Sequence, residues 1–173
     1  QQTALVQLSV QSYLSAIEKD SIKGQPDKKI TGEIIVNLGV AYAILGNMEE
    51  GVKYLSKGIQ INPDNSNGYL NRGLIYFNAA QYELAAKDYD EYIRLNTYNP
   101  DIYYSRGLCR FNLNRIEESV PDYNKAMALK PTEPLYYIAR SRAYRILGNI
   151  SASINDANKA KQMGAAVPPE LLQ

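Results

Sequence analysis

The sequence predicts an all-α protein, a solenoid of antiparallel helix pairs, and three observations lead to this class. The first is a fixed period of 34 residues, which is the interval from Arg72 to Arg106 and from Arg106 to Arg140. The second is that apolar residues within each period recur at steps of three and four, the spacing of one face of an α-helix. The third is a break in the middle of each period, which divides it into two helices. One such pair cannot bury its apolar face alone, so neighbouring pairs must stack.

A fourth copy of the period precedes the three arginines, with Leu38 in the arginine column. The columns around this position keep their character: aromatic or apolar before it, small after it, then a tyrosine and a helix-breaking position. The second half of each period has small, large and small columns and ends near a proline. In copy order, the columns are Ile35, Tyr69, Tyr103 and Tyr137; Gly39, Gly73, Gly107 and Ser141; Tyr42, Tyr76, Arg110 and Tyr144; Gly46, Ala80, Asn114 and Gly148; Gly51, Ala85, Ser119 and Ser153; Leu55, Tyr89, Tyr123 and Ala157; Gly58, Tyr92, Ala126 and Ala160; and Pro63, Thr97, Pro131 and Ala165.

This pattern resembles the tetratricopeptide repeat (TPR) family, whose repeat of this length carries Leu-Gly, Tyr, Ala, an aromatic residue and a closing Pro. The first copy matches through Leu38, Gly39, Tyr42 and Pro63, whereas Arg110 departs from the tyrosine column. The resemblance covers most of the chain and implies a right-handed superhelix of four repeats. We expect these repeats at residues 32–65, 66–99, 100–133 and 134–167.

The two ends of the chain depart from the period. Residues 2–22 read as one helix that matches only the second half of a repeat, and the stretch IKGQPDKK then separates it from repeat one. We therefore interpret residues 1–31 as an N-terminal capping helix, or the remnant of a half-repeat, followed by a linker. Residues 168–173 are expected to form a C-terminal cap. Because the first residue is Gln rather than Met, we expect the chain to be processed or cut from something longer.

The arginine column varies together with a second column that follows it about half a period later. That column holds Asp88, Asp122 and Asp156 where the first holds Arg72, Arg106 and Arg140, and it holds Tyr54 where the first holds Leu38. The matched presence and absence predicts structural ion pairs, within a repeat or with the preceding one. A ladder of arginines for an anionic ligand is the alternative interpretation, which the acidic column disfavours.

Composition argues against several other functions. The chain has no His, so the commonest general base and metal ligand is missing. Its single Cys, Cys109, stands in a small apolar column and is expected in the core. A net charge of +1 disfavours a nucleic-acid-binding protein, and no apolar run is long enough to cross a membrane. We therefore expect neither an enzyme, a cofactor, a nucleic-acid partner nor membrane insertion. A cytoplasmic and an exported bacterial location both stay open.

What remains is a binding surface. In the family that the chain resembles, the first helix of each pair lines a concave groove that holds a peptide segment of a partner. Carried over by column, the groove residues are Val36, Asn37, Val40, Leu70, Asn71, Leu74, Phe77, Asn78, Tyr104, Leu108, Phe111, Ile138, Arg142 and Arg145. This lining is apolar and aromatic and lacks the family's clamp for acidic chaperone tails. The resemblance implies a protein–protein interaction scaffold; the alternative is a structural spacer or self-association module of a larger protein.

Overall fold

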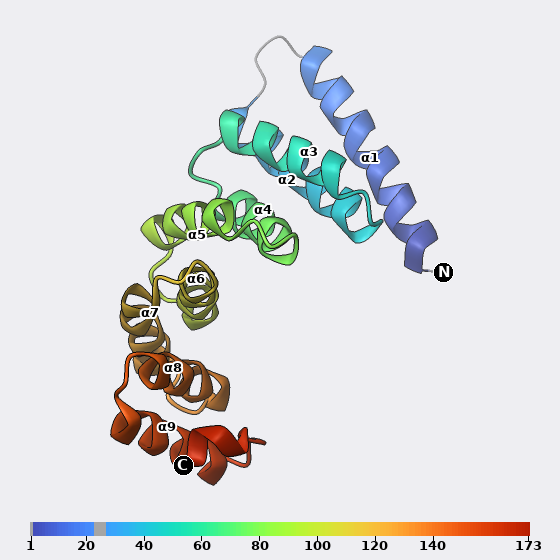
Figure 1. Cartoon of the computed structure of the whole chain (residues 1–173). Helices are drawn as coiled ribbons and strands as arrows, with labels where there is room; N and C mark the ends of the chain where they lie inside the picture. The colour runs from blue at the N-terminus through green and yellow to red at the C-terminus, as the bar shows by residue number, and fades with distance from the viewer. Residues whose placement is uncertain (1, 23–26) are drawn as a thin grey trace. The chain divides into compact units, whose positions relative to one another are not determined.

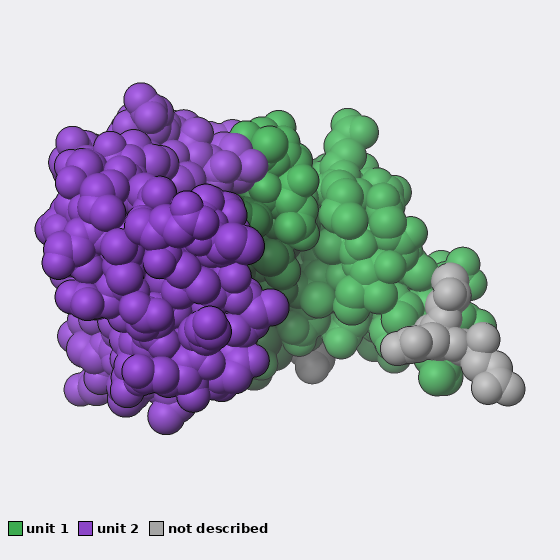
Figure 2. Space-filling model, turned by 60° about the horizontal axis from the view of Figure 1, so that its bottom comes forward, with its two compact units in different colours: residues 1–81 green, residues 82–173 purple. Residues whose placement is uncertain are grey.

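The computed structural model describes residues 2–22 and 27–173, and this part contains nine α-helices, one 3₁₀-helix and no β-strand (Figure 1). The chain divides into two compact units, residues 1–81 and 82–173, which Figure 2 colours green and purple. The first unit contains α1 (Gln2–Ile22), α2 (Lys28–Ile44), α3 (Met48–Ile61) and α4 (Ser66–Asn78). The second unit contains α5 (Tyr82–Leu95), α6 (Pro100–Asn112), α7 (Ile116–Leu129), α8 (Pro134–Ile146), α9 (Ile150–Gln162) and η1 (Pro169–Leu172).

Each unit is a stack of consecutive helices. In the first unit α2 packs on α1 and α3, and α4 packs on both α3 and α2. In the second unit each helix from α6 to α9 packs on the one before it, and α6 also contacts α8. The predicted all-α solenoid of helix pairs is therefore confirmed.

The break column of the sequence lies two residues after the last residue of the first helix of each pair. Its four residues all have a positive φ: 83° at Gly46, 56° at Ala80, 60° at Asn114 and 77° at Gly148. This left-handed conformation is the usual helix C-terminal stop, because it turns the backbone N–H groups back to the last carbonyls. In the first pair, the Gly46 amide donates to the Ala43 carbonyl at 3.0 Å.

Polar side chains cap the N-termini of several helices. The side-chain oxygens of Asn47, Asn65, Asn99 and Asn149 accept hydrogen bonds from the first-turn amides of α3, α4, α6 and α9. Asp27 caps α2 in the same way, so the last residues of the predicted linker, from Lys28 onward, belong to that helix. The linker's residues 23–26 lie outside the part that the structure describes.

The N-terminal helix covers the apolar face of repeat one. Val10 of α1 forms a buried cluster with Leu38 and Ala41 of α2. Val6, Tyr13, Leu14, Ile17, Tyr42, Leu45 and Tyr54 pack around this cluster. Burial of these side chains gives α1 its position in the first unit.

The C-terminal segment covers the last helix pair in a comparable way. Leu171 of η1 is buried against Ile138 of α8 and Ala157 and Ala160 of α9. Leu171 follows Tyr137 by one full period, so it stands in the same column. The tail thus covers the surface of α8 and α9 on which the first helix of a following repeat would pack.

Close packing inside a helix pair depends on a small residue facing a large one. A Cβ atom on Gly107 would lie 2.6 Å from Cε1 of Tyr123, which is fully buried. In repeat four the corresponding residues are Ser141 and Ala157, and the Ser141 hydroxyl donates to the Ser153 carbonyl at 2.8 Å. Repeat four thus combines two small residues at these positions, and the side chain of Ser141 finds room because Ala157 has no ring.

Candidate functional site

Two members of the arginine column, Arg106 and Arg140, form partly buried ion pairs within their own repeats. Arg106 donates to both carboxylate oxygens of Asp122, with Nη2 at 2.5 Å and Nε at 3.1 and 3.2 Å. Arg140 makes the same fork to Asp156, with two bonds of 2.7 Å. These contacts raise the pKa of Arg140, the hydrogen bonds to Asp156 being the largest cause. The guanidinium groups are therefore engaged with carboxylates rather than open to an anionic ligand. Arg72 and Asp88, the pair expected in repeat two, belong to different units.

Arg110, which departs from the family pattern, is part of the same ion pair. Its Nη1 donates to Oδ2 of Asp122 at 2.9 Å, so two arginines share one buried carboxylate. Tyrosines occupy this column in the other repeats, and the Tyr144 ring lies 5.4 Å from the Arg140 guanidinium. Either residue type in this column thus contacts the ion pair.

A third column, which the sequence analysis missed, accepts the remaining arginine N–H groups. Each arginine donates Nη1 to a polar residue about half a period earlier, in the preceding repeat. The acceptors are Ser56 for Arg72 at 2.9 Å, Asp90 for Arg106 at 2.6 Å, and Asn124 for Arg140 at 2.5 Å. A polar residue in three successive copies of this column was the signal that could have revealed it.

The predicted groove residues of the first unit differ widely in exposure. Val36 is only 1% exposed, so its assignment to an open groove is wrong. A Cβ atom on Gly58 would lie 2.6 Å from its Cγ2, which shows that the missing side chain lets Val36 fill the space between helices. Exposed members are Asn37, Leu74 and Asn78, and half-buried members are Val40, Leu70, Asn71 and Phe77.

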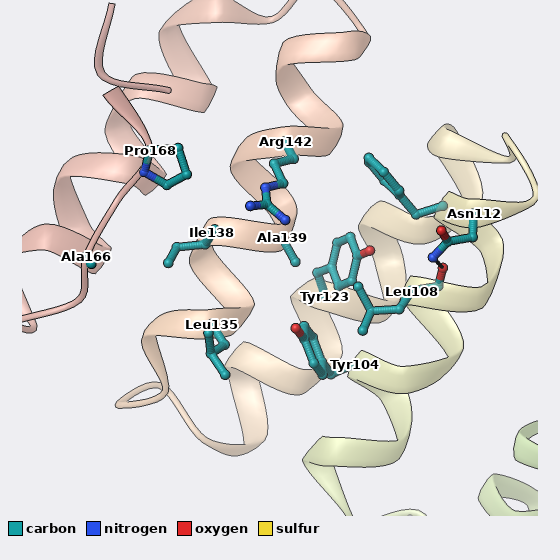
Figure 3. A pocket seen from close by; sticks show the side chains of 11 residues that line it. Tyr104, Leu108, Asn112, Tyr123, Leu135, Ile138, Ala139, Arg142, Ala166 and Pro168 are labelled. Carbon is teal, nitrogen blue, oxygen red and sulfur yellow. Dashed lines mark hydrogen bonds between the residues drawn. The ribbon is translucent and has the colours of Figure 1, made fainter. Parts of the chain in front are cut away.

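In the second unit the structure brings several predicted residues together around one pocket (Figure 3). The pocket has a volume of about 340 Å³ and lies between α6 and α8. Its predicted members are Tyr104, Leu108, Phe111, Ile138 and Arg142. Its further members, which column reasoning missed, are Asn112, Tyr123, Leu135, Ala139, Ala166 and Pro168. The C-terminal segment therefore forms one wall of the pocket.

Arg145 does not line this pocket, although the sequence placed it in the groove. Its Nη1 instead donates to the backbone carbonyl of Gln173 at 2.8 Å, which fixes the end of the tail to α8. Arg142, one turn earlier on the same helix, is left as the one ionised side chain among the described residues that line the pocket.

Aromatic residues form the floor of the pocket. The Tyr104 ring lies between Tyr123 and Tyr136, with centroid distances of 6.1 and 5.1 Å. The Tyr136 hydroxyl donates to Asp101 of α6 at 2.5 Å and so ties α8 to α6. Burial raises the pKa of Tyr104, while the positive charge of Arg142 opposes this rise. These contacts link α6, α7 and α8 at the pocket.

The described residues contain neither a cluster of metal ligands nor a reactive thiol. No group of three or more Cys, Asp or Glu side chains could hold a metal ion in this part of the chain. Cys109 is fully buried, and burial raises the pKa of its thiol to about 12, which keeps it protonated and unreactive. None of the described helices combines the length and the apolar character needed to cross a membrane.

The described helices thus define an α-solenoid of helix hairpins with an apolar pocket between first helices. Two profiles of the tetratricopeptide repeat family match the sequence, one over residues 32–65 and one over residues 70–134. The chain belongs to the tetratricopeptide repeat family. Proteins of this family are generally non-enzymatic scaffolds, and the fold supports a protein-interaction scaffold here.

Several solved structures share this fold. A crystal structure of MamA is 21% identical, with a TM-score of 0.78 over 90% of this chain and 86% of that one. MamA from Desulfovibrio magneticus RS-1, residues 41 to the end, is 16% identical, with a TM-score of 0.72 over 90% and 95%. YrrB, described as a TPR protein with an unusual peptide-binding site, is 14% identical, with a TM-score of 0.76 over 89% and 75%. No curated protein sequence matches the chain.

Proposed function

We propose that this protein is a scaffold that binds a peptide segment of a partner protein, with an apolar side chain of that segment anchored in the pocket of the second unit. The observation that carries this proposal is the pocket itself. Its volume of about 340 Å³ falls in the range of ligand sites, about 300–1,000 Å³. Its lining is mainly apolar and aromatic with a few polar groups, which is the usual composition of such sites.

An exposed leucine beside the pocket supports the same proposal. Leu135 of α8 lines the pocket and yet has 53% of its surface exposed. Apolar surface that stays open next to a concave site gains free energy when a ligand covers it. A protein of the same fold, YrrB, is described by its peptide-binding site, which supports a function of this kind for the present chain.

Selection of peptides from a displayed random library tests the proposal. Peptides enriched on the wild-type protein should share apolar anchor residues, and their affinities can be measured for purified variants. Leu135→Glu places a carboxylate on the apolar wall and should weaken binding about tenfold or more, a loss of at least about 1.4 kcal/mol. Because Leu135 is exposed, this variant should keep the helical content and the unfolding free energy of the wild type.

Leu84→Glu is the matched control. Leu84 of α5 is 43% exposed, belongs to the same unit and does not line the pocket. We expect this variant to bind the selected peptides like the wild type. Equal binding by wild type and Leu135→Glu, or the absence of any enriched peptide, would reject the proposed pocket.

A further inference from the structure

Among the arginines of the described chain, Arg142 stands apart. The other seven each have a polar partner: Arg72 with Ser56, Arg94 with Glu91, Arg106 and Arg110 with Asp122, Arg115 with Glu83, Arg140 with Asp156, and Arg145 with the Gln173 carbonyl. For Arg142 the described residues provide no hydrogen-bond or ion-pair partner. This arginine is therefore available to a group from outside the chain.

The place of Arg142 matters as much as its lack of a partner. It lies on the exposed surface of α8, and its side chain lines the pocket beside Ile138 and Ala139 (Figure 3). The attraction between the guanidinium and a carboxylate strengthens when a bound segment covers the pocket, because the covered site has a lower dielectric constant than water. A guanidinium can also hold a carboxylate by two parallel hydrogen bonds, which gives the contact a defined geometry.

We propose that the segment bound in this pocket carries an Asp or Glu side chain next to its apolar anchor and that Arg142 recognises this carboxylate. The proposal rests on the proposed function, since it specifies the chemistry of the segment that the pocket takes. Arg142 is then the specificity-determining residue, whereas the apolar lining supplies the anchoring contacts.

Parallel selections on the wild type and on Arg142→Glu test the charge preference. Library peptides joined to a coat protein through their C-terminus have no free α-carboxylate, so an acidic preference must come from Asp or Glu side chains. We expect the wild type to enrich Asp or Glu at a fixed spacing from the apolar anchor. Arg142→Glu should keep the anchor and enrich Lys or Arg at that spacing, because its charge is reversed.

Lys87→Glu is the matched control for net charge. Lys87 is exposed on α5 in the same unit and does not line the pocket, so its selected peptides should match those of the wild type. An acidic peptide from the wild-type selection should bind Arg142→Glu about tenfold more weakly or worse. The affinity of the wild-type protein for this peptide should decrease as the salt concentration rises from about 0.1 to 1 M. This salt dependence should be lost in Arg142→Gln.

The outcomes separate this inference from the proposed function. Anchored peptides without an acidic preference, or an acidic preference that persists in Arg142→Glu, would overturn the inference and leave the pocket in place. If nothing is enriched, or if Leu135→Glu has no effect, both fail.

Discussion

Tyr42 stacks on Tyr54 in repeat one, with ring centroids 5.2 Å apart and ring planes within 9° of each other. Tyr54 stands in the column that holds Asp122 in repeat three, and Tyr42 stands in the column of Arg110. The third member of the set, fully buried Leu38, replaces Arg106. The same place between the helices is thus filled by an apolar set in one repeat and by an ion-pair set in another.

Transfer of the apolar set to repeat three should be tolerated, whereas partial transfer should not. Asp122→Tyr alone leaves Arg106 and Arg110 without their buried carboxylate and should cost about 3–5 kcal/mol of unfolding free energy. The triple variant Arg106→Leu, Arg110→Tyr and Asp122→Tyr should recover most of this loss. Asp90 then loses its arginine partners, but its half-exposed carboxylate can be solvated by water.

Denaturant unfolding of the single, double and triple variants, followed by circular dichroism, measures the coupling. The control is a double variant in which Asp122 is kept and only the two arginines are replaced, which should stay destabilised. A complete transfer that is less stable than Asp122→Tyr would show that the apolar set does not fit repeat three.

The contact between Gly107 and Tyr123 predicts a second coupling. Gly107→Ser should destabilise the protein by about 1–3 kcal/mol, because its Cβ would overlap the buried Tyr123 ring. In a background of Tyr123→Ala the same substitution should cost much less, since repeat four combines Ser141 with Ala157. A double-mutant cycle of unfolding free energies tests this. Additive losses would contradict the steric coupling between these two positions.

Ala80 occupies a conformation that suits glycine better. Its φ of 56° lies in the left-handed region, where a Cβ atom costs about 1 kcal/mol. We expect Ala80→Gly to raise the unfolding free energy by about 0.5–1 kcal/mol. Ala79→Gly, one residue earlier at a φ of −84°, is the control and should lower stability instead. Thermal unfolding of the pair would show opposite shifts, and a fall in both would contradict the strain at Ala80.

Alkaline pH should weaken the second unit. Burial raises the pKa of Cys109 from 9.0 to about 12 and raises the pKa of Tyr89, Tyr123 and Tyr136 above their ordinary value. A raised pKa in the folded state means that folding favours the neutral form of the group. The stability that this preference contributes is therefore fully present below about pH 9. For Cys109 it is lost as the pH rises from 9.0 to about 12.

Unfolding free energy measured against pH, together with phenolate absorbance, tests this expectation. The buried tyrosines should ionise in the same step in which helical structure is lost. Cys109→Ala should flatten the decline by up to about 1.4 kcal/mol per pH unit, because one titrating group is removed. Ionisation of every tyrosine at its ordinary pKa, with the helices intact, would contradict the burial of these hydroxyls.

The pocket could be predicted from the sequence only in part. Column reasoning selected Leu108, Phe111 and Arg142 because they lie on one face of first helices at helical spacing. It could not find Tyr123, which comes from a second helix, or Pro168, which comes from the tail. It also placed Val36 on the surface, because a helical face does not show how closely a glycine such as Gly58 lets the next helix approach.

The sequence by itself determined the repeat, the helix pairs and the residues at which the first helices end, because these depend on local rules that recur in every copy of the period. A left-handed residue and an apolar helical face have the same physical consequences in each repeat. Only the tertiary structure decided which arginines have partners, where the pocket lies and which of its walls the tail supplies. Those features depend on contacts between helices of neighbouring repeats, and the distance and angle between packed helices follow from all their side chains together.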